Sequence, residues 1–316
     1  MFQLKNQKIS IKKIASFLNI KYTKKNFHIE TVSSLNNIKN NSLLFYSNST
    51  NFVSKKSNMK FDFKKLEKFE NIAIISDIIP KKKINVPILF STNPQFDFYR
   101  IIQNFFLTTE FVNNIHKTAI IEKNSKLGKN VYIGSHCYIG NNVKIGDNTI
   151  ILHNTCIYGK TEIGSGSVIK SNTTIGSEGF GFIPINKELY HLPHVGSILI
   201  GDNVWIGSNT TIEKSHIDQT IIEDHVKIDD LVQIGHNTII KEFTQITAAC
   251  IICGKAKIGK NCWISPNSVI DVGCEIGDNC IVGTSSLVRS NFSKNSVVVG
   301  SPAKFLKKMF KHYNGK

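Results

Sequence analysis

The stretch that decides the fold is IGSHCYIGNNVKIGDNTI, residues 133–150, in which isoleucine followed by glycine returns every six residues. An aliphatic residue keeps this spacing from 115 to 175, at 200, 206 and 212, and from 222 to 288. A period of six fits neither a helix nor a simple alternating strand. It fits a coil with short flat sides, in which one aliphatic side chain per side points inward. Stacked coils of this kind bury a continuous aliphatic column.

The cysteines follow the same repeat. Five of the seven stand at the fifth position of a six-residue unit, where other units carry Val, Thr, Ser or Ala: Cys137, Cys250, Cys262, Cys274 and Cys280. The repeat itself sets their spacing, so we expect small buried core residues rather than a disulfide framework or a metal site.

The two ends of the chain lack the repeat. Residues 10–20 predict an amphipathic helix capped by Ser10, 71–77 and 86–91 predict buried strands, and 93–106 predict a helix with Pro94 in its first turn. These elements indicate a small α/β domain over residues 1–110, before a β-helix over 111–300. Residues 301–316 predict a short basic helix with Pro302 at its first position. Its apolar stripe, expected to cover the end of the coil, is Phe305, Leu306, Met309 and Phe310.

The charge balance is strongly basic, with 39 Lys and Arg against 23 Asp and Glu. Such a surface favours an anionic partner: a phosphate-bearing substrate, an acidic carrier protein, a membrane surface or nucleic acid. Lysine and asparagine are spread along the whole chain, which is typical of AT-rich coding sequence, so we expect no nucleic-acid partner. The N-terminus has no signal-peptide pattern, and no stretch is long enough to span a bilayer. Together these features predict a cytoplasmic protein without a transmembrane segment.

Two breaks interrupt the repeat. Residues 176–199 form a long excursion, which is typical of a functional loop. The shorter break at 213–221 is interpreted as an adjustment of the coil. Just after it, His236 stands at the third position of its unit, where a side chain lies at a corner outside the coil.

The repeat resembles that of the left-handed parallel β-helix of hexapeptide acyltransferases, and this resemblance implies three units, or 18 residues, per coil. Adding 18 residues to His236 gives Gly254, which should lie directly beneath it at about one strand spacing of ~4.8 Å. A histidine above a backbone donor is the minimum equipment for acyl transfer. The base removes a proton from the attacking amine, and the N–H stabilises the oxyanion. This chemistry needs no nucleophilic Ser or Cys.

A resemblance to a known family rests on four stretches in order: NPQFDFYRIIQNFF (93–106), IGSEGFGF (175–182), VGSILIGDNVWIGSNTTIEKS (195–215) and KIDDLVQIGHN (227–237). Over nearly the whole chain, this order resembles the UDP-3-O-acylglucosamine N-acyltransferases of lipid A synthesis. The resemblance implies a left-handed parallel β-helix, a homotrimer and active sites between adjacent coils. It also implies His236 as general base and the Gly254 amide as oxyanion donor.

The same resemblance implies that residues 1–110 bind the uridine part of a nucleotide sugar. Phe45 and Asn48 match positions that hold the uracil ring, and the third such position falls on Asn51, beside Phe52. Asp230 and Gln233, close before the histidine, are further candidates for substrate binding. No bound cofactor or metal is expected.

Several residues depart from the family's pattern. Gly273 stands where the family has a second histidine, Asp230 stands where it has Asn, and TTIEKS replaces TTIDRG. The ending VVVGSPAKFLKK is similar to that of coenzyme A-dependent sugar acetyltransferases. Two versions of an N-acyltransferase acting on a nucleotide-linked amino sugar therefore stay open. One uses an acyl carrier protein donor in lipid A synthesis. The other uses acyl-CoA on a UDP- or dTDP-amino sugar for O-antigen.

Two other classes of function remain as alternatives. A β-helix metalloenzyme of carbonic anhydrase type would need three converging histidines, for which the candidates are His153, His225 and His236. A catalytically inactive scaffold or sugar-binding protein is compatible with Gly273 in place of the second histidine.

Overall fold

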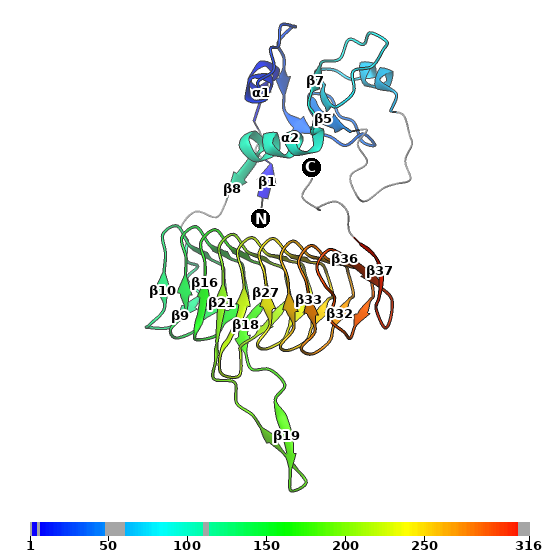
Figure 1. The fold of residues 1–316 in the computed structure, drawn as a ribbon. Helices are drawn as coiled ribbons and strands as arrows, with labels where there is room; N and C mark the ends of the chain where they lie inside the picture. The colour runs from blue at the N-terminus through cyan, green and yellow to red at the C-terminus, as the bar shows by residue number, and fades with distance from the viewer. Residues whose placement is uncertain (1, 5–6, 48–60, 110–113, 309–316) are drawn as a thin grey trace. The chain divides into compact units, whose positions relative to one another are not determined.

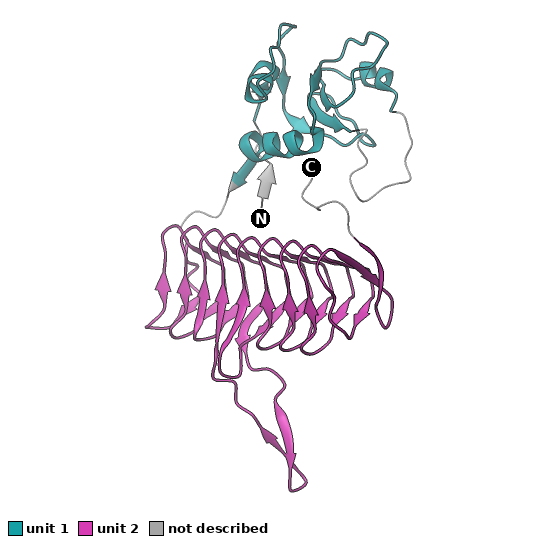
Figure 2. Cartoon of the chain, in the orientation of Figure 1, with its two compact units in different colours: residues 1–110 teal, residues 111–316 magenta. Residues whose placement is uncertain are grey.

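The computed structural model describes residues 2–4, 7–47, 61–109 and 114–308. The chain divides into two compact units, Met1–Glu110 and Phe111–Lys316, shown in different colours in Figure 2.

Unit 1 is built around a four-stranded parallel sheet. Its strands, in spatial order, are β4 (Thr31–Val32), β5 (Ser42–Tyr46), β6 (Ala73–Ser76) and β7 (Ile88–Phe90). Two antiparallel pairs flank it: β1 (Phe2–Leu4) with β8 (Leu107–Thr109), and β2 (Ile9–Ser10) with β3 (His28–Ile29). The helical segments are α1 (Ile11–Phe17), η1 (Phe63–Lys68), α2 (Pro94–Ile101) and η2 (Ile102–Phe106).

Capping side chains start both α-helices where the sequence predicts. The Ser10 hydroxyl accepts a hydrogen bond from the Lys13 N–H, and Asn93 caps α2 through the Phe96 N–H, just before Pro94. Alternate residues of the sheet face two separate cores. Leu43 packs with the helices on one side, and Leu44 packs with η1 on the other. A parallel sheet covered on both faces explains the continuous apolar runs of its strands, and the predicted α/β domain is confirmed.

Unit 2 is a parallel β-helix whose coils stack along three sheets (Figure 1). The first sheet contains β10 (Lys126–Leu127), β13 (Lys144–Ile145), β16 (Thr161–Ile163), β21 (Ser197–Ile200), β24 (Gln219–Ile222), β27 (Ile239–Ile240), β30 (Lys257–Ile258) and β33 (Glu275–Ile276). The second contains β11 (Tyr132–Ile133), β14 (Ile150–Ile151), β17 (Val168–Ile169), β22 (Trp205–Ile206), β25 (Lys227–Ile228), β28 (Gln245–Ile246), β31 (Trp263–Ile264), β34 (Ile281–Val282), β36 (Ser296–Val299) and β37 (Lys304–Lys308). The third contains β9 (Ile120–Ile121), β12 (Tyr138–Ile139), β15 (Cys156–Ile157), β18 (Thr174–Ser177), β23 (Thr211–Glu213), β26 (Gln233–Ile234), β29 (Ile251–Ile252), β32 (Val269–Ile270) and β35 (Leu287–Val288).

The register of these sheets confirms the 18-residue coil. Ile133 pairs with Ile151 and Ile234 pairs with Ile252, so each aliphatic residue lies above its counterpart one coil away. These side chains form one buried cluster along the unit. The mainly β fold class, a β-helix of hexapeptide repeats after a small α/β domain, is confirmed.

The fourth position of many units is a corner with left-handed backbone. Asn142, Asn148 and Asn237 have φ of 61°, 56° and 59°, and most of the non-glycine residues with positive φ in the described part of unit 2 are asparagines. A short polar side chain tolerates this conformation better than most others. The coil geometry thus gives a structural reason for many of the asparagines, which the sequence analysis interprets as a result of AT-rich coding sequence.

The five repeat cysteines are buried in the column, as expected: Cys137, Cys250, Cys262, Cys274 and Cys280. Burial raises the pKa of the Cys137 and Cys250 thiols, and both donate to backbone carbonyls, of Leu152 and Ser265. They act as small core residues with a weak donor.

The long break forms a hairpin outside the coil. Strands β19 (Phe182–Ile185) and β20 (Glu188–His191) pair antiparallel and extend away from the stacked coils (Figure 1). The short break adds four residues to one coil, because Leu199 pairs with Ile221, 22 residues later, instead of 18.

The predicted C-terminal helix is wrong for the residues that the structure describes. Lys304–Lys308 form β37, which pairs antiparallel with β36, and Phe305 and Leu306 are 52% and 57% exposed. The last coil offers an unpaired strand edge, whose backbone groups a following segment satisfies as a strand. Met309, Phe310 and the rest of 309–316 lie outside the described residues. Among the described helices, none has the length and apolarity to cross a membrane.

Candidate active site

The candidate site is centred on the turn that follows β26. His236 lies at the third position of its unit and its ring rests on Gly254, one coil further along. A Cβ added to Gly254 would be 2.7 Å from the His236 Nε2 atom. The sequence predicts this stacking, and the structure brings the two residues together as expected.

Hydrogen bonds at the third position of other units show how a backbone N–H at this position can be satisfied. In several units of the first and second sheets, the third-position N–H donates to the third-position side chain of the next coil: Lys129 to Asp147, Ser135 to His153, Ser165 to Asp202, Ser208 to Asp230 and Lys260 to Asp278. One coil beyond Gly254 stands Val272, whose aliphatic side chain has no hydrogen-bond acceptor atom. Gly254 is buried, and no acceptor for its N–H is found among the described residues. This donor is therefore available to a ligand.

Asn237 fixes the tautomer of His236. Its Oδ1 atom accepts a hydrogen bond from the His216 backbone N–H at 3.2 Å, so this atom is the carbonyl oxygen of the amide. The same oxygen lies 2.9 Å from the His236 Nδ1 atom. Because Oδ1 can only accept, Nδ1 carries the proton, and the lone pair of the neutral ring is on Nε2, which faces Gly254.

Glu213 holds the backbone of this turn. One carboxylate oxygen accepts from the His236 N–H at 3.1 Å, and the other accepts from the Gln233 side-chain amide at 2.7 Å. Burial raises the pKa of Glu213 above its ordinary value, although these hydrogen bonds oppose the shift. Gln233, predicted to bind substrate, is thus engaged by the carboxylate that positions His236.

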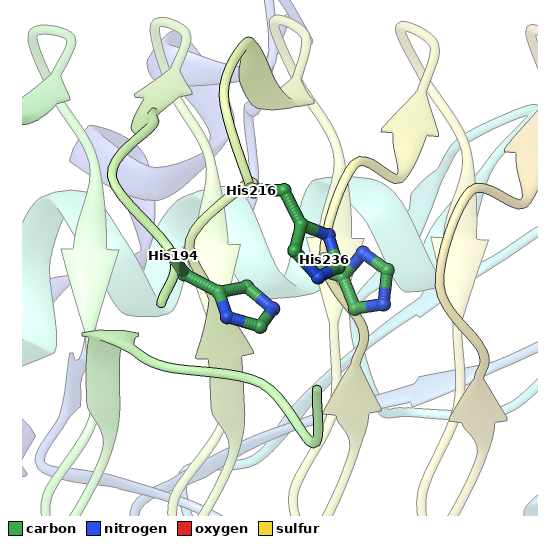
Figure 3. Close-up of side chains that lie close together, drawn as sticks. All are labelled: His194, His216 and His236. Carbon is green, nitrogen blue, oxygen red and sulfur yellow. The ribbon is translucent and has the colours of Figure 1, made fainter. Parts of the chain in front are cut away.

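Two further histidines that sequence reasoning missed lie beside His236 (Figure 3). The ring centroids of His194 and His216 are 3.8 Å apart, and that of His216 is 4.2 Å from that of His236. His194 comes from the long break and His216 from the short one. The interpretation of the short break as a mere coil adjustment is therefore incomplete, because it carries Ser215 and His216 into the site.

The predicted trio of His153, His225 and His236 is not assembled. His153 accepts the Ser135 N–H, and His225 stacks on Phe243 with ring centroids 4.8 Å apart. Of the predicted trio, only His236 belongs to the three-histidine group found among the described residues. The other two members of that group are His194 and His216.

Asp230 serves the scaffold rather than the His236 ring. Its Oδ1 atom accepts from Lys170 Nζ at 2.6 Å and from the Ser208 N–H at 2.7 Å. Burial opposes ionisation, but these hydrogen bonds and the lysine charge together lower the pKa of Asp230. Gly273, where the resemblance expects a histidine, has φ +69° and open space around the position of a Cβ.

Of the predicted uracil-binding residues, only Phe45 is described. Its ring packs against Phe98, with centroids 4.8 Å apart, and lies 6.3 Å from the Tyr99 ring. Phe45 remains half-buried, so one part of it belongs to the core of unit 1. Asn48, Asn51 and Phe52 lie outside the described residues.

A concavity of about 660 Å³ opens beside His194, lined also by Tyr158, Glu178, Val195 and Lys214. A larger one of about 800 Å³ lies along the first sheet of unit 2, lined by Lys144, Glu162 and Leu199 among others. The smaller one is next to the histidines, so size alone does not mark the site.

The comparisons with known proteins agree with this architecture. The family model described as bacterial transferase hexapeptide (six repeats) matches residues 114–146, 142–177 and 255–290. UDP-3-O-acylglucosamine N-acyltransferase of Delftia acidovorans is 32% identical over 130 residues, covering 41% of this chain and 39% of that protein. The namesake from Hahella chejuensis is 36% identical over 43% of this chain and 39% of its own length.

The resemblance inferred from the sequence is confirmed, but over less of the chain than expected. The chain aligns with about two fifths of the length of these curated relatives. Among solved structures, UDP-N-acetylglucosamine O-acyltransferase from Moraxella catarrhalis matches with a TM-score of 0.56 and 26% identity. This match covers 61% of this chain and 74% of that one. The Francisella novicida UDP-N-acetylglucosamine acyltransferase, 22% identical with a TM-score of 0.57 over 62% and 70%, supports the fold alone.

Proposed function

We propose that this protein is an N-acyltransferase that moves an acyl group from a thioester donor to the amine of a nucleotide-linked amino sugar. The names of the curated relatives support this class of reaction. The observation that carries the proposal is that the His236 Nε2 lone pair lies next to the Gly254 N–H, which has no acceptor among the described residues.

In the proposed reaction, the sugar amine attacks the thioester carbonyl carbon while His236 Nε2 takes a proton from the amine. The Gly254 N–H donates to the oxyanion of the tetrahedral intermediate. The C–S bond then breaks, and the protonated His236 returns a proton to the leaving thiolate. Glu213 holds the turn and Asn237 holds the tautomer throughout.

For the substrates, we propose a UDP-linked glucosamine acceptor and an acyl carrier protein donor, used in the cytoplasm by a homotrimer. The net charge of +16 suits both anionic substrates. Phe45 with Asn48 and Phe52 is proposed to hold the base of the nucleotide. Acyl-CoA as donor, with a UDP- or dTDP-amino sugar for O-antigen, is the alternative that the same assay separates.

The test offers the full chain acyl carrier protein and acyl-CoA thioesters in parallel, each with UDP- and dTDP-amino sugars, and measures released thiol. His236→Ala should lower turnover by about 10²- to 10⁴-fold, the range of a general base. His153→Ala, at the same position of another coil, is the matched control and should leave turnover unchanged. Turnover of His236→Ala close to wild type would contradict the mechanism, and thiol release only from acyl-CoA would favour the alternative donor.

A further inference from the structure

We propose that His194, His216 and His236 form a binding site for a divalent transition-metal ion, with Zn²⁺ as the type case. One ring nitrogen of each lies within 4.8 Å of the others. The second part of the inference, that the ion blocks acyl transfer, rests on the proposed function. The binding itself does not.

The hydrogen bonds of the three rings engage the Nδ1 atoms and leave the Nε2 atom of each histidine available to the ion. His194 Nδ1 lies 3.2 Å from the Leu192 carbonyl oxygen, and the Nδ1 atoms of His216 and His236 lie 3.4 and 2.9 Å from the Asn237 carbonyl oxygen. A carbonyl oxygen accepts, so each Nδ1 is the protonated nitrogen and each Nε2 has its lone pair. Metal-binding histidines are typically held this way, with the second nitrogen donating to a carbonyl.

The Nε2 atom of His194 lacks a partner in a place where one is needed. His194 is 1% exposed, and its Nε2 is buried with no hydrogen-bond partner among the described residues. A buried polar atom left unpaired costs on the order of 1–3 kcal/mol. A metal ion would satisfy this atom.

Glycines of the long break leave room over these nitrogens. A Cβ at Gly179 would lie 2.9 Å from His194 Nε2, and one at Gly181 would lie 3.3 Å from His216 Nε2. A Cβ at Gly179 would also meet the carboxylate of Glu213, which therefore lies next to the cluster. The loop therefore covers the cluster closely without placing a side chain in the space that an ion would take.

The ligand set selects the kind of ion. Imidazole favours Zn²⁺, Cu²⁺, Ni²⁺ and Co²⁺ over Mg²⁺ and Ca²⁺, which prefer oxygen ligands. Zn–N bonds of about 2.0–2.1 Å in a tetrahedron require ring nitrogens roughly 3.3 Å apart. Binding thus brings the three ring nitrogens closer together by rotation about the side-chain bonds. The same rotation ends the stacking of the His194 ring on the His216 ring. The fourth position is left to water.

Occupation of this site removes the proposed base. Coordination through His236 Nε2 uses the lone pair that would accept the proton of the amine. Zn²⁺ should therefore inhibit thiol release, and a chelator should restore it.

The test measures binding by calorimetry, using the chelator-stripped full chain and Zn²⁺, Co²⁺ or Mg²⁺ alone. We expect one Zn²⁺ per chain, a visible Co²⁺ spectrum of tetrahedral type, and no heat with Mg²⁺. His194→Ala and His216→Ala should each weaken Zn²⁺ binding by about 100-fold or more. His216→Gln, which keeps most of the side-chain volume, guards against loss of folding as the cause. His153→Ala and His225→Asn are matched controls and should bind as wild type does.

Equal Zn²⁺ affinity in wild type, His194→Ala and His216→Gln would overturn the site, as would a Mg²⁺ affinity similar to that for Zn²⁺. If acyl transfer is detected, His194→Ala should raise the Zn²⁺ concentration for half-inhibition by the same factor by which it weakens binding. If no donor is ever used, the proposed function fails, while calorimetry still decides the metal site.

Discussion

Val272 stands one coil beyond Gly254, at the position from which an acidic or histidine side chain elsewhere engages the backbone N–H above it. The valine leaves the Gly254 donor without an acceptor. At position 272 an aliphatic side chain thus stands where the first and second sheets of the β-helix place an acceptor.

An acceptor side chain at position 272 should block the oxyanion site. In Val272→Asp, the new carboxylate should accept the Gly254 N–H, as Asp230 accepts that of Ser208. Losing one oxyanion donor lowers kcat by about 10²- to 10³-fold, so we expect a loss of that size in thiol release. Val272→Asn tests the same hydrogen bond without the charge, and Val272→Ala should keep wild-type turnover. Full activity in both Val272→Asp and Val272→Asn would contradict the role of the Gly254 amide.

Asn237 is expected to act as a positioning residue. Asn237→Gly fits the corner φ of 59° but removes the oxygen that holds the His236 tautomer. We expect kcat to fall by about tenfold or more with little change in KM. Asn237→Asp keeps that oxygen and should recover most of the rate. Its added negative charge favours the protonated imidazole, so the acid limb of the pH–rate profile should move to higher pH. An unshifted profile in Asn237→Asp would show that the side chain acts only on folding.

Asp230 should make stability depend on pH in the acid range. Its pKa in the folded protein is lowered from the ordinary 3.8. The folded state therefore binds fewer protons than the unfolded state between these two values, and the stabilisation from the Lys170 pair is present above pH 3.8 and lost as pH falls through the folded-state value.

Asp230→Asn should consequently be less stable than wild type at pH 7, with the difference shrinking as the pH falls below 4. Urea midpoints at several pH values measure this, and Asp229→Asn, which removes the same charge one residue away, is the control. A difference that stays constant down to pH 3 would mean that the Lys170–Asp230 pair contributes through packing alone.

The sequence by itself determined the β-helix, its register and the stacking of His236 on Gly254. A fixed 18-residue coil turns distance along the chain into position in space, so one addition places a side chain above its neighbour. The buried cysteines follow from the same arithmetic.

Only the tertiary structure decided the rest of the site. His194 and His216 enter from the two breaks, where inserted residues cancel the coil arithmetic and a loop's path depends on what it packs against. Strand β37 likewise forms where a helix is predicted, because the edge of the last coil supplies backbone partners that local sequence does not reveal. Repeats fix what lies inside the coil, whereas insertions and edges depend on contacts between residues far apart in the chain.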